Sequence, residues 1–388
     1  MTRPASRLSD ALDSYTSNRV YLDHASTSPP RPEVVEAMLP WLGAADPRRV
    51  HTEGRMARAA LEEGREKVAA LLGTRPRQVI FTSGGTEAIN AAVYGALARG
   101  SGRRVVCAPV EHSAVRDSSQ RAAFVDAVGV TQTGRIDIDQ LLGSLETDTA
   151  LVHCQWGNHE VGTLQPVADV VAACRERGVL VHVDAAAAAG HVPIAFDDLG
   201  ADLMSVSAHK LGGPKGSGAL LIRRGLRLPP MLVGGDQERA RRAGLEDVAA
   251  QVGFGAVAET LTSGALEAEA VRARAQTDRL LSAALDIPGV TAYGDKAERL
   301  PHVICLGVDG VEAEAVLLGL DQAGVAAHSG SACSSEALEP SPVLAAMGVD
   351  AERSLRLSVG WSTRNDEIEV AAAALPAVVD RLRALAAG

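Results

Sequence analysis

A turn of small residues is the first motif whose side chains and backbone could do chemistry. Ser83-Gly84-Gly85-Thr86-Glu87-Ala88 follows the apolar run Val79–Phe81 and opens a helical stretch. Small residues at a strand-to-helix turn let backbone N–H groups converge on an anion, and the helix dipole adds to the attraction. A phosphate group therefore suits this turn. The motif is neither a Walker loop nor GxGxxG, and an ordinary N-capped helix would also explain it.

A carboxylate ends another apolar run. The stretch Val179-Leu180-Val181-His182-Val183-Asp184-Ala185 predicts a strand that Asp184 terminates. In open α/β sheets, ligands bind outside the carboxyl ends of the strands. A carboxylate in that place can hold a protonated ring nitrogen, although capping of a helix is an equally simple role for it.

A lysine follows the next predicted strand. Leu203-Met204-Ser205-Val206-Ser207-Ala208-His209-Lys210 leads into the turn Gly212-Gly213-Pro214-Lys215-Gly216. A desolvated lysine loses its proton readily and can form a Schiff base, whereas an exposed one in a turn does neither. If the two strands pair, Asp184 and Lys210 lie at neighbouring strand ends. A phosphate turn, a carboxylate and a Schiff-base lysine together are what pyridoxal phosphate chemistry needs.

One cysteine stands apart from the others. Cys333 lies in a run of small and polar residues, 328–341, whereas Cys107, Cys154, Cys174 and Cys305 lie on or beside apolar runs. An accessible loop cysteine can react, while a buried one is inert. The 5 cysteines form no CxxC pair and are odd in number, so they predict reduced thiols and not a disulfide framework.

Short apolar runs alternate with amphipathic stretches, which predicts an α/β fold. The expected strands are Val79–Phe81, Arg104–Ala108, Ala150–Gln155, Leu180–Val183, Leu203–Ser207 and Ala219–Ile222, and the helices between them are Met56–Leu72, Thr86–Arg99, His112–Ala123 and Val167–Arg177. A long helix is expected over Ala256–Leu285. The remainder predicts a smaller α+β part with strands His302–Leu306, Gly324–Ala327 and Ser354–Ser358 and helices Glu312–Gln322 and Glu367–Ala386.

Composition excludes several classes of protein. The 388 residues are 46% hydrophobic and 22% charged, which is the balance of a globular chain and not of a disordered one. No apolar run approaches the roughly 20 residues of a membrane span, and no signal peptide is recognisable at the N-terminus. A net charge of −10 and only 3% aromatic residues disfavour a direct nucleic-acid binder.

The chain resembles the cysteine desulfurases among the fold-type I pyridoxal phosphate enzymes, in the group of the iron–sulfur assembly desulfurases. The diagnostic motifs are Ser207-Ala208-His209-Lys210 and Ser329-Gly330-Ser331-Ala332-Cys333-Ser334-Ser335, followed by Leu338-Glu339-Pro340-Ser341. The resemblance implies a large, mainly parallel cofactor domain over residues 20–258. A smaller α+β domain would comprise residues 1–19 and 259–388, including a catalytic cysteine loop at about 328–341.

The resemblance also implies roles for individual residues, with no metal among the ligands. Lys210 would form the Schiff base with pyridoxal 5'-phosphate, and Asp184 would pair with the ring nitrogen. His112 would stack on the ring and act as acid and base. Gly85, Thr86, Ser207 and His209 would hold the phosphate, while Asn158 and Arg356 would bind the substrate amino acid. The implied enzyme is a cytoplasmic homodimer that converts L-cysteine to L-alanine, leaving a persulfide on Cys333 for a sulfur-acceptor protein.

Three positions depart from the usual family pattern. Ala187 stands where a glutamine usually contacts the cofactor ring, Leu245 replaces a threonine that reaches the partner subunit's phosphate, and His159 replaces the second asparagine of Asn-Asn-Glu. We expect looser cofactor binding from the lost hydrogen bonds. The altered pocket also motivates an alternative, a specialised C–S or selenocysteine lyase. A separate and less favoured alternative is a catalytically weak sulfur-relay scaffold that binds partners.

Overall fold

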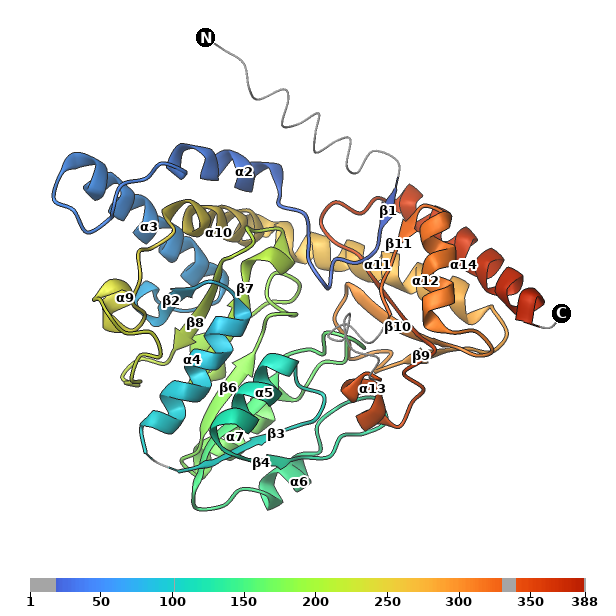
Figure 1. Cartoon of the computed structure of the whole chain (residues 1–388), viewed down its shortest axis with the longest axis horizontal. Coiled ribbons are helices and arrows are strands. Elements are labelled where there is room, and N and C mark those ends of the chain that lie inside the picture. The colour runs from blue at the N-terminus through green and yellow to red at the C-terminus, as the bar shows by residue number, and fades with distance from the viewer. Residues whose placement is uncertain (1–18, 101, 330–339, 387–388) are drawn as a thin grey trace, which may run out of the picture.

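The computed structural model describes residues 19–100, 102–329 and 340–386. A seven-stranded sheet with the order β2-β8-β7-β6-β5-β3-β4 forms its larger part (Figure 1). Four of the six neighbouring pairs are parallel, and both pairs that involve β8 are antiparallel. The strands are β2 (Val79–Thr82), β3 (Arg104–Cys107), β4 (Phe124–Ala127), β5 (Thr149–Gln155), β6 (Leu180–Asp184), β7 (Leu203–Ser207) and β8 (Gly218–Ile222).

The sheet is buried on both faces because its strands alternate apolar side chains between two layers of helices. Val79 and Phe81 of β2 pack in one core cluster, with α3 (Thr52–Leu71), α7 (Val167–Glu176) and α10 (Val248–Thr260). Ile80, between them, packs in another cluster with α4 (Gly85–Ala98) on the opposite face. This period of two is the side-chain spacing of a strand, and burial on both sides explains the nearly continuous apolar runs in the sequence.

Shorter elements connect this layered core. Helix α5 (Ser113–Ala122) packs against α4, and α6 (Ile138–Gly143) packs against α7. The others are α2 (Pro32–Met38), η1 (Leu39–Trp41), η2 (Pro76–Gln78), α8 (Phe196–Leu199), η3 (Ala208–Leu211) and α9 (Gln237–Ala240). Their turns bring the carboxyl ends of β5, β6 and β7 to one edge, where Asp184 is in register with Gln155 and Ser205.

A second core cluster is built around an antiparallel sheet with the order β12-β10-β9, which lies to the right in Figure 1. Its strands are β9 (Val290–Tyr293), β10 (Val303–Val308) and β12 (Ser354–Ser358), and its helices are α11 (Leu266–Leu285), α12 (Ala313–Gln322) and α14 (Asn365–Ala386). Helix α13 (Pro342–Met347) follows in the chain but packs against the first cluster, through Val343, Leu344 and Met347. Near the start of the chain, β1 (Val20–Tyr21) pairs in parallel with β11 (Val325–Ala326). Val20 and Leu22 therefore pack in this second cluster.

The predicted fold class, a mainly parallel α/β sheet followed by a smaller α+β part, is confirmed. The helix expected over Ala256–Leu285 is not continuous. A π-type turn, Leu261–Ala265, separates α10 from α11, and Gly264 there has φ 102°, a backbone conformation that favours glycine. The short strands β4 and β9 were not expected, because a polar residue interrupts each four-residue strand and most of their residues are not buried.

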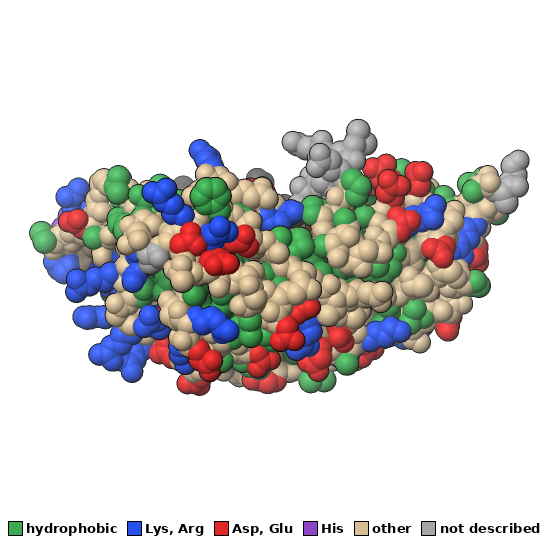
Figure 2. All heavy atoms as spheres, turned by 90° about the horizontal axis from the view of Figure 1, so that it is seen from below, with side chains coloured by type: hydrophobic (Ala, Val, Ile, Leu, Met, Phe, Trp, Pro, Cys, Tyr) green, Lys and Arg blue, Asp and Glu red, His purple; other side chains and the backbone are tan. Residues whose placement is uncertain are grey.

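Charge is unevenly spread over the surface. Figure 2 shows Lys and Arg side chains gathered toward the end of the molecule where Figure 1 places α3 and α9. Arg48, Arg49, Arg55, Arg75 and Arg77 are exposed in this region. Among the described residues, no helix is long and apolar enough to cross a membrane.

Candidate active site

The glycine-rich turn lies at the N-terminus of α4 and against the end of β7. A Cβ on Gly85 would be 3.6 Å from the Cβ of Ser207. No side chain caps α4 at Gly84 among the described residues, and the buried hydroxyl of Ser207 has no hydrogen-bond partner there. Uncapped helix amides beside an unpartnered hydroxyl are donors that suit a phosphate. The residues present thus fit the phosphate of the expected cofactor.

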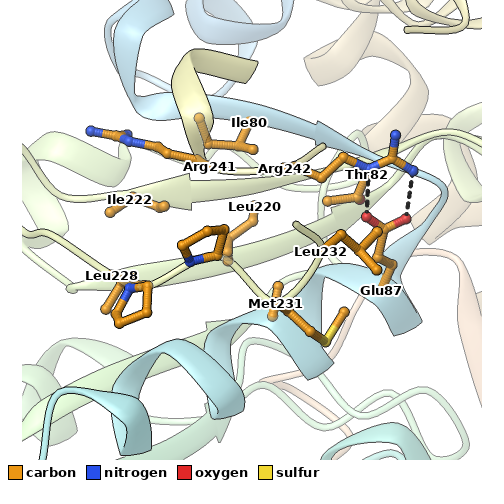
Figure 3. Close-up of a pocket in the computed structure, with 13 residues that line it drawn as sticks. Ile80, Thr82, Glu87, Leu220, Ile222, Leu228, Met231, Leu232, Arg241 and Arg242 are labelled. Atoms are coloured by element: carbon orange, nitrogen blue, oxygen red, sulfur yellow. Dashed lines mark hydrogen bonds and ion pairs between the residues drawn. The ribbon is translucent and has the colours of Figure 1, made fainter. Parts of the chain in front are cut away.

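A partly buried ion pair ties this turn to the segment that contains Leu245. Arg242 donates from Nε to Oε1 of Glu87 at 2.8 Å and from Nη2 to Oε2 at 3.2 Å, as Figure 3 shows. Ser83 N–H also donates to Glu87, at 2.7 Å. Burial alone raises the pKa of Glu87, but the hydrogen bonds from Arg242 and Ser83 bring the pKa below its usual value. These two residues therefore hold the first turn of α4 in place.

Asp184 ends β6 with one carboxylate oxygen fixed by its neighbours. Oδ1 accepts from Ser205 Oγ at 2.9 Å and from the N–H of Ala186 at 3.0 Å. The residue is 8% exposed. A carboxylate held in this way at a strand end can pair with a protonated ring nitrogen. Ala187, on the same turn, is partly buried and has no polar side-chain atom to offer a ring.

Lys210 lies in η3, directly after the strand that ends at Ser207. Its charge acts on His112, whose pKa it helps to lower, so the lysine and that histidine share one electrostatic environment. His209 shares a hydrogen bond of 3.1 Å with Thr27 Oγ1. Burial, followed by the charges of Lys210 and Lys215, lowers the pKa of His209 to about 4, so it is neutral at pH 7.

His112 is the N-cap of α5, and its Nδ1 accepts the N–H of Ala114 at 3.0 Å. The neutral ring therefore carries its proton on Nε2. Burial lowers the pKa of His112 to about 3, with further contributions from His159 and Lys210 that the charge of Asp184 opposes. A neutral imidazole is suited to stacking on an electron-poor ring, where an imidazolium would be repelled.

Arg356 lies on β12 and is almost fully buried, with 1% of its surface exposed. Its Nη1 donates to the carbonyl oxygen of His159 at 3.0 Å, and its Nη2 donates to Asp23 at 2.9 Å and to Ser26 at 2.6 Å. Within the described part of the chain, Nε has no partner. An unpartnered buried donor on a guanidinium is a binding point for a carboxylate.

Asn158 lies in the loop that joins β5 to α7 and is fully buried. Its Oδ1 accepts the N–H groups of Glu160 and Val161, both at 2.8 Å, and its Nδ2 donates to Val110 O at 3.1 Å. These bonds show that the side chain shapes its own loop. Its expected contact with substrate stays a prediction.

The cysteines divide as the sequence predicts, as far as the structure describes them. Cys107, Cys154, Cys174 and Cys305 are buried and free, and none is more than 3% exposed. Burial raises the pKa of the Cys107, Cys174 and Cys305 thiols to about 12, and that of Cys154 well above its usual value. Such thiols are poor nucleophiles. Cys333 lies outside the described residues.

Several residues that support the site were missed by sequence reasoning. Ser205 orients Asp184, Thr27 contacts His209, and Asp23 and Ser26 engage Arg356. Ser205 could have been found, because it is a polar residue facing the neighbouring strand end inside an apolar run. The segment 23–27 matches the family pattern, but the roles of Asp23, Ser26 and Thr27 were not predicted, because they reach the site only through tertiary packing.

Comparison with known proteins places this geometry in a family. The family described as "Aminotransferase class-V" matches residues 20–370. A cysteine desulfurase of Trichormus azollae is 40% identical over 377 residues, which cover 94% of each chain. The solved structure of a "NifS-like protein" has a TM-score of 0.87 at 29% identity and covers 94% of this chain and 100% of its own. A structure titled "SspA in complex with cysteine" has a TM-score of 0.77 at 27% identity, with coverages of 87% and 98%.

Proposed function

The chain belongs to the class-V aminotransferase family, among its cysteine desulfurases, and we propose that it converts L-cysteine to L-alanine and leaves the sulfur as a persulfide on Cys333. The observation that carries the proposal is the convergence of Asp184, Lys210 and the N-terminus of α4 at one edge of the sheet. The family's cofactor is pyridoxal phosphate, and the residues at this edge fit it.

Each end of the cofactor has residues that would hold it. The uncapped amides at Gly85 and Thr86, with the hydroxyl of Ser207, would receive the phosphate, and His209 would lie beside them. Asp184 would hold the ring nitrogen, and Lys210 would supply the amine that links to the cofactor. When bound, pyridoxal phosphate provides an electron sink for negative charge at the α-carbon of an attached amino acid.

The chain's own side chains would position the substrate and move its protons. The substrate carboxylate would bind at Arg356, where Nε is the unpartnered donor. Nζ of Lys210 would accept the proton from the α-carbon of cysteine. His112 carries a proton on Nε2 and would exchange it at the ring face.

Sulfur transfer conserves atoms without an outside oxidant. The thiolate of Cys333 would attack the sulfur of the substrate, so that an S–S bond forms while the Cβ–S bond of the substrate breaks. The electron pair of the broken bond stays on Cβ, which is then protonated to the methyl group of alanine. Cysteine and a thiol thus become alanine and a persulfide. The thiolate form is required because a thiol is a poor nucleophile.

We further propose a homodimer. Three apolar side chains of the segment 232–245 are strongly exposed, Leu232 at 40%, Val233 at 79% and Leu245 at 63%. Arg242, in the same segment, is anchored to the phosphate turn through Glu87. A second copy covering this segment would bury its apolar side chains close to the cofactor. Light scattering on the purified protein tests this, and a monomer at micromolar concentration would contradict it.

The acceptor and the compartment are also proposals. We infer that the persulfide passes to a sulfur-acceptor protein, because a persulfide is consumed by transfer to another nucleophile. A reducing, cytoplasmic setting would suit the chemistry. The four buried cysteines, all free, support it.

One experiment tests the whole function. Holoenzyme incubated with L-cysteine and a thiol reductant should release alanine and sulfide in equal amounts and show an absorbance band of the lysine-bound cofactor. Cys333→Ala should keep the band and lose alanine formation, whereas Lys210→Ala should lose both. Alanine formation that survives Cys333→Ala would favour the lyase alternative, which the altered Ala187, Leu245 and His159 positions motivate. An absent band would favour the scaffold alternative.

A further inference from the structure

A second imidazole packs against His112. The ring centroids of His112 and His159 are 5.1 Å apart, and the ring planes meet at 66°, an edge-to-face arrangement. His159 is only 6% exposed. Its ring therefore covers one side of a histidine that is itself only partly buried, and it keeps water from that side.

His159 is held firmly in this position. Its carbonyl oxygen accepts from Nη1 of Arg356 at 3.0 Å, and its Nε2 lies 3.5 Å from Oε1 of Glu160. Glu160 is fixed in turn, because its N–H donates to Asn158 and its carboxylate accepts from Ser341 Oγ. These contacts hold both the backbone and the ring of His159 in place.

The charges around both rings oppose protonation. Lys210 and Arg116 act on His112 and on His159, and Arg356 acts on His159 as well. One acid acts the other way, since Asp184 raises the pKa of His112. Glu160 also faces His159, with its Oε1 3.5 Å from Nε2. Burial is the largest effect on each ring and lowers the pKa of both, so neither imidazole carries a proton on both nitrogens at neutral pH.

We propose that His159 is a positioning residue for His112. It covers the edge of that ring, excludes water from it, and so keeps it neutral with its single proton on Nε2. The usual asparagine of the family has no ring and would leave this side of His112 more open. The inference rests on the proposed function only in giving His112 a place in the reaction, because the packing itself is independent of catalysis.

An NMR titration of the full-length holoenzyme tests the packing. With ring-labelled histidine, the His112 signal is identified as the one lost in His112→Gln. In wild type it should keep neutral shifts down to the acid limit of folding. In His159→Asn it should titrate with a midpoint moved toward the ordinary value of about 6.5. His159→Phe keeps a ring in place and should behave as wild type.

His153→Asn is the matched control. His153 is another fully buried histidine, and its ring nitrogens pair with His182 and with Ser119 of α5, not with His112. Its loss therefore destabilises the protein without removing a contact of the His112 ring. The His112 titration should be that of wild type. An unchanged His112 midpoint in His159→Asn, or an equal shift in His153→Asn, would overturn the proposal.

The pH dependence of kcat/KM separates this inference from the proposed function. In His159→Asn, kcat/KM should fall at acidic pH with a midpoint equal to the new His112 midpoint. In His159→Phe, kcat/KM should keep the wild-type pH dependence. A shifted NMR midpoint without a shifted profile would contradict the catalytic role of His112 and leave the packing role standing. A shifted profile without a shifted midpoint would contradict the packing role.

Discussion

Ser205 Oγ lies 2.9 Å from Asp184 Oδ1 and donates to it across two neighbouring parallel strands. The two residues are in register on β6 and β7, so the sheet itself sets the distance. A second donor, the N–H of Ala186, binds the same oxygen. The carboxylate is therefore oriented before any ligand arrives, which reduces the ordering that binding would otherwise require.

Ser205→Ala should weaken pyridoxal phosphate binding by about tenfold, because a hydrogen bond to a charged group is worth about 1.5–3 kcal/mol and the N–H of Ala186 remains. Absorbance titration of the apo-protein measures the Kd. Ser119→Ala is the control, since Ser119 is also buried and its hydroxyl hydrogen-bonds His153 and not Asp184. Equal affinities for wild type and Ser205→Ala would refute the orienting role.

Arg356→Lys should raise KM for L-cysteine by about tenfold or more with a smaller effect on kcat. A lysine keeps the charge but cannot present the planar set of donors that a carboxylate binds. Steady-state kinetics at saturating cofactor measures both constants. Arg299→Lys is the control, because Arg299 is a buried arginine on another part of the second core. A fall in kcat alone would place Arg356 outside substrate binding.

Ala187→Gln and Leu245→Thr return to the residues usual in the family. Each should tighten cofactor binding by about two- to tenfold, since one regained hydrogen bond contributes about 0.5–1.5 kcal/mol. Titration of apo-protein gives the affinities. The Leu245→Thr gain requires the dimer and should vanish in a monomeric form. Wild-type affinity already equal to that of the double variant would contradict looser binding.

The sequence predicts the strands of the large sheet well because burial on both faces leaves continuous apolar runs. Asp184 and Lys210 could be placed at one edge because parallel strands end together. Other features depend on tertiary contacts between distant segments. The pairing of β1 with β11 joins residues about 300 positions apart, and the ion pair of Arg356 with Asp23 spans 333 positions. No local pattern contains that information.

Stability should be greatest near pH 6.5, because buried histidines and buried glutamates act in opposite directions. Burial lowers the pKa of His153 to about 3 and that of His182 and His302 well below the usual value. Below about pH 6.5 these histidines bind protons in the unfolded chain but stay neutral in the folded protein. The free energy of unfolding therefore falls as pH falls. Each such histidine contributes up to about 1.4 kcal/mol per pH unit.

Above pH 6.5 the buried glutamates determine how the stability changes with pH. Burial raises the pKa of Glu111 to about 8 and that of Glu160 to about 7. The unfolded chain releases these protons near pH 4.5 while the folded protein retains them, so their effect is a loss of stability as pH rises toward 8. Between pH 4.5 and 6.5 the more numerous histidines outweigh them.

Urea unfolding at about pH 5, 6.5 and 8 with saturating cofactor measures the three stabilities. Glu111→Gln should flatten the decline above pH 6.5, since a glutamine keeps the acceptor for the N–H of Gln155 but has no proton to lose. Below pH 6.5 this variant should lose stability more steeply than wild type, because Glu111 no longer offsets the buried histidines between pH 4.5 and 6.5. A stability that rises steadily to pH 8 in wild type would show that the Glu111 and Glu160 carboxyl groups ionise without cost in the folded protein.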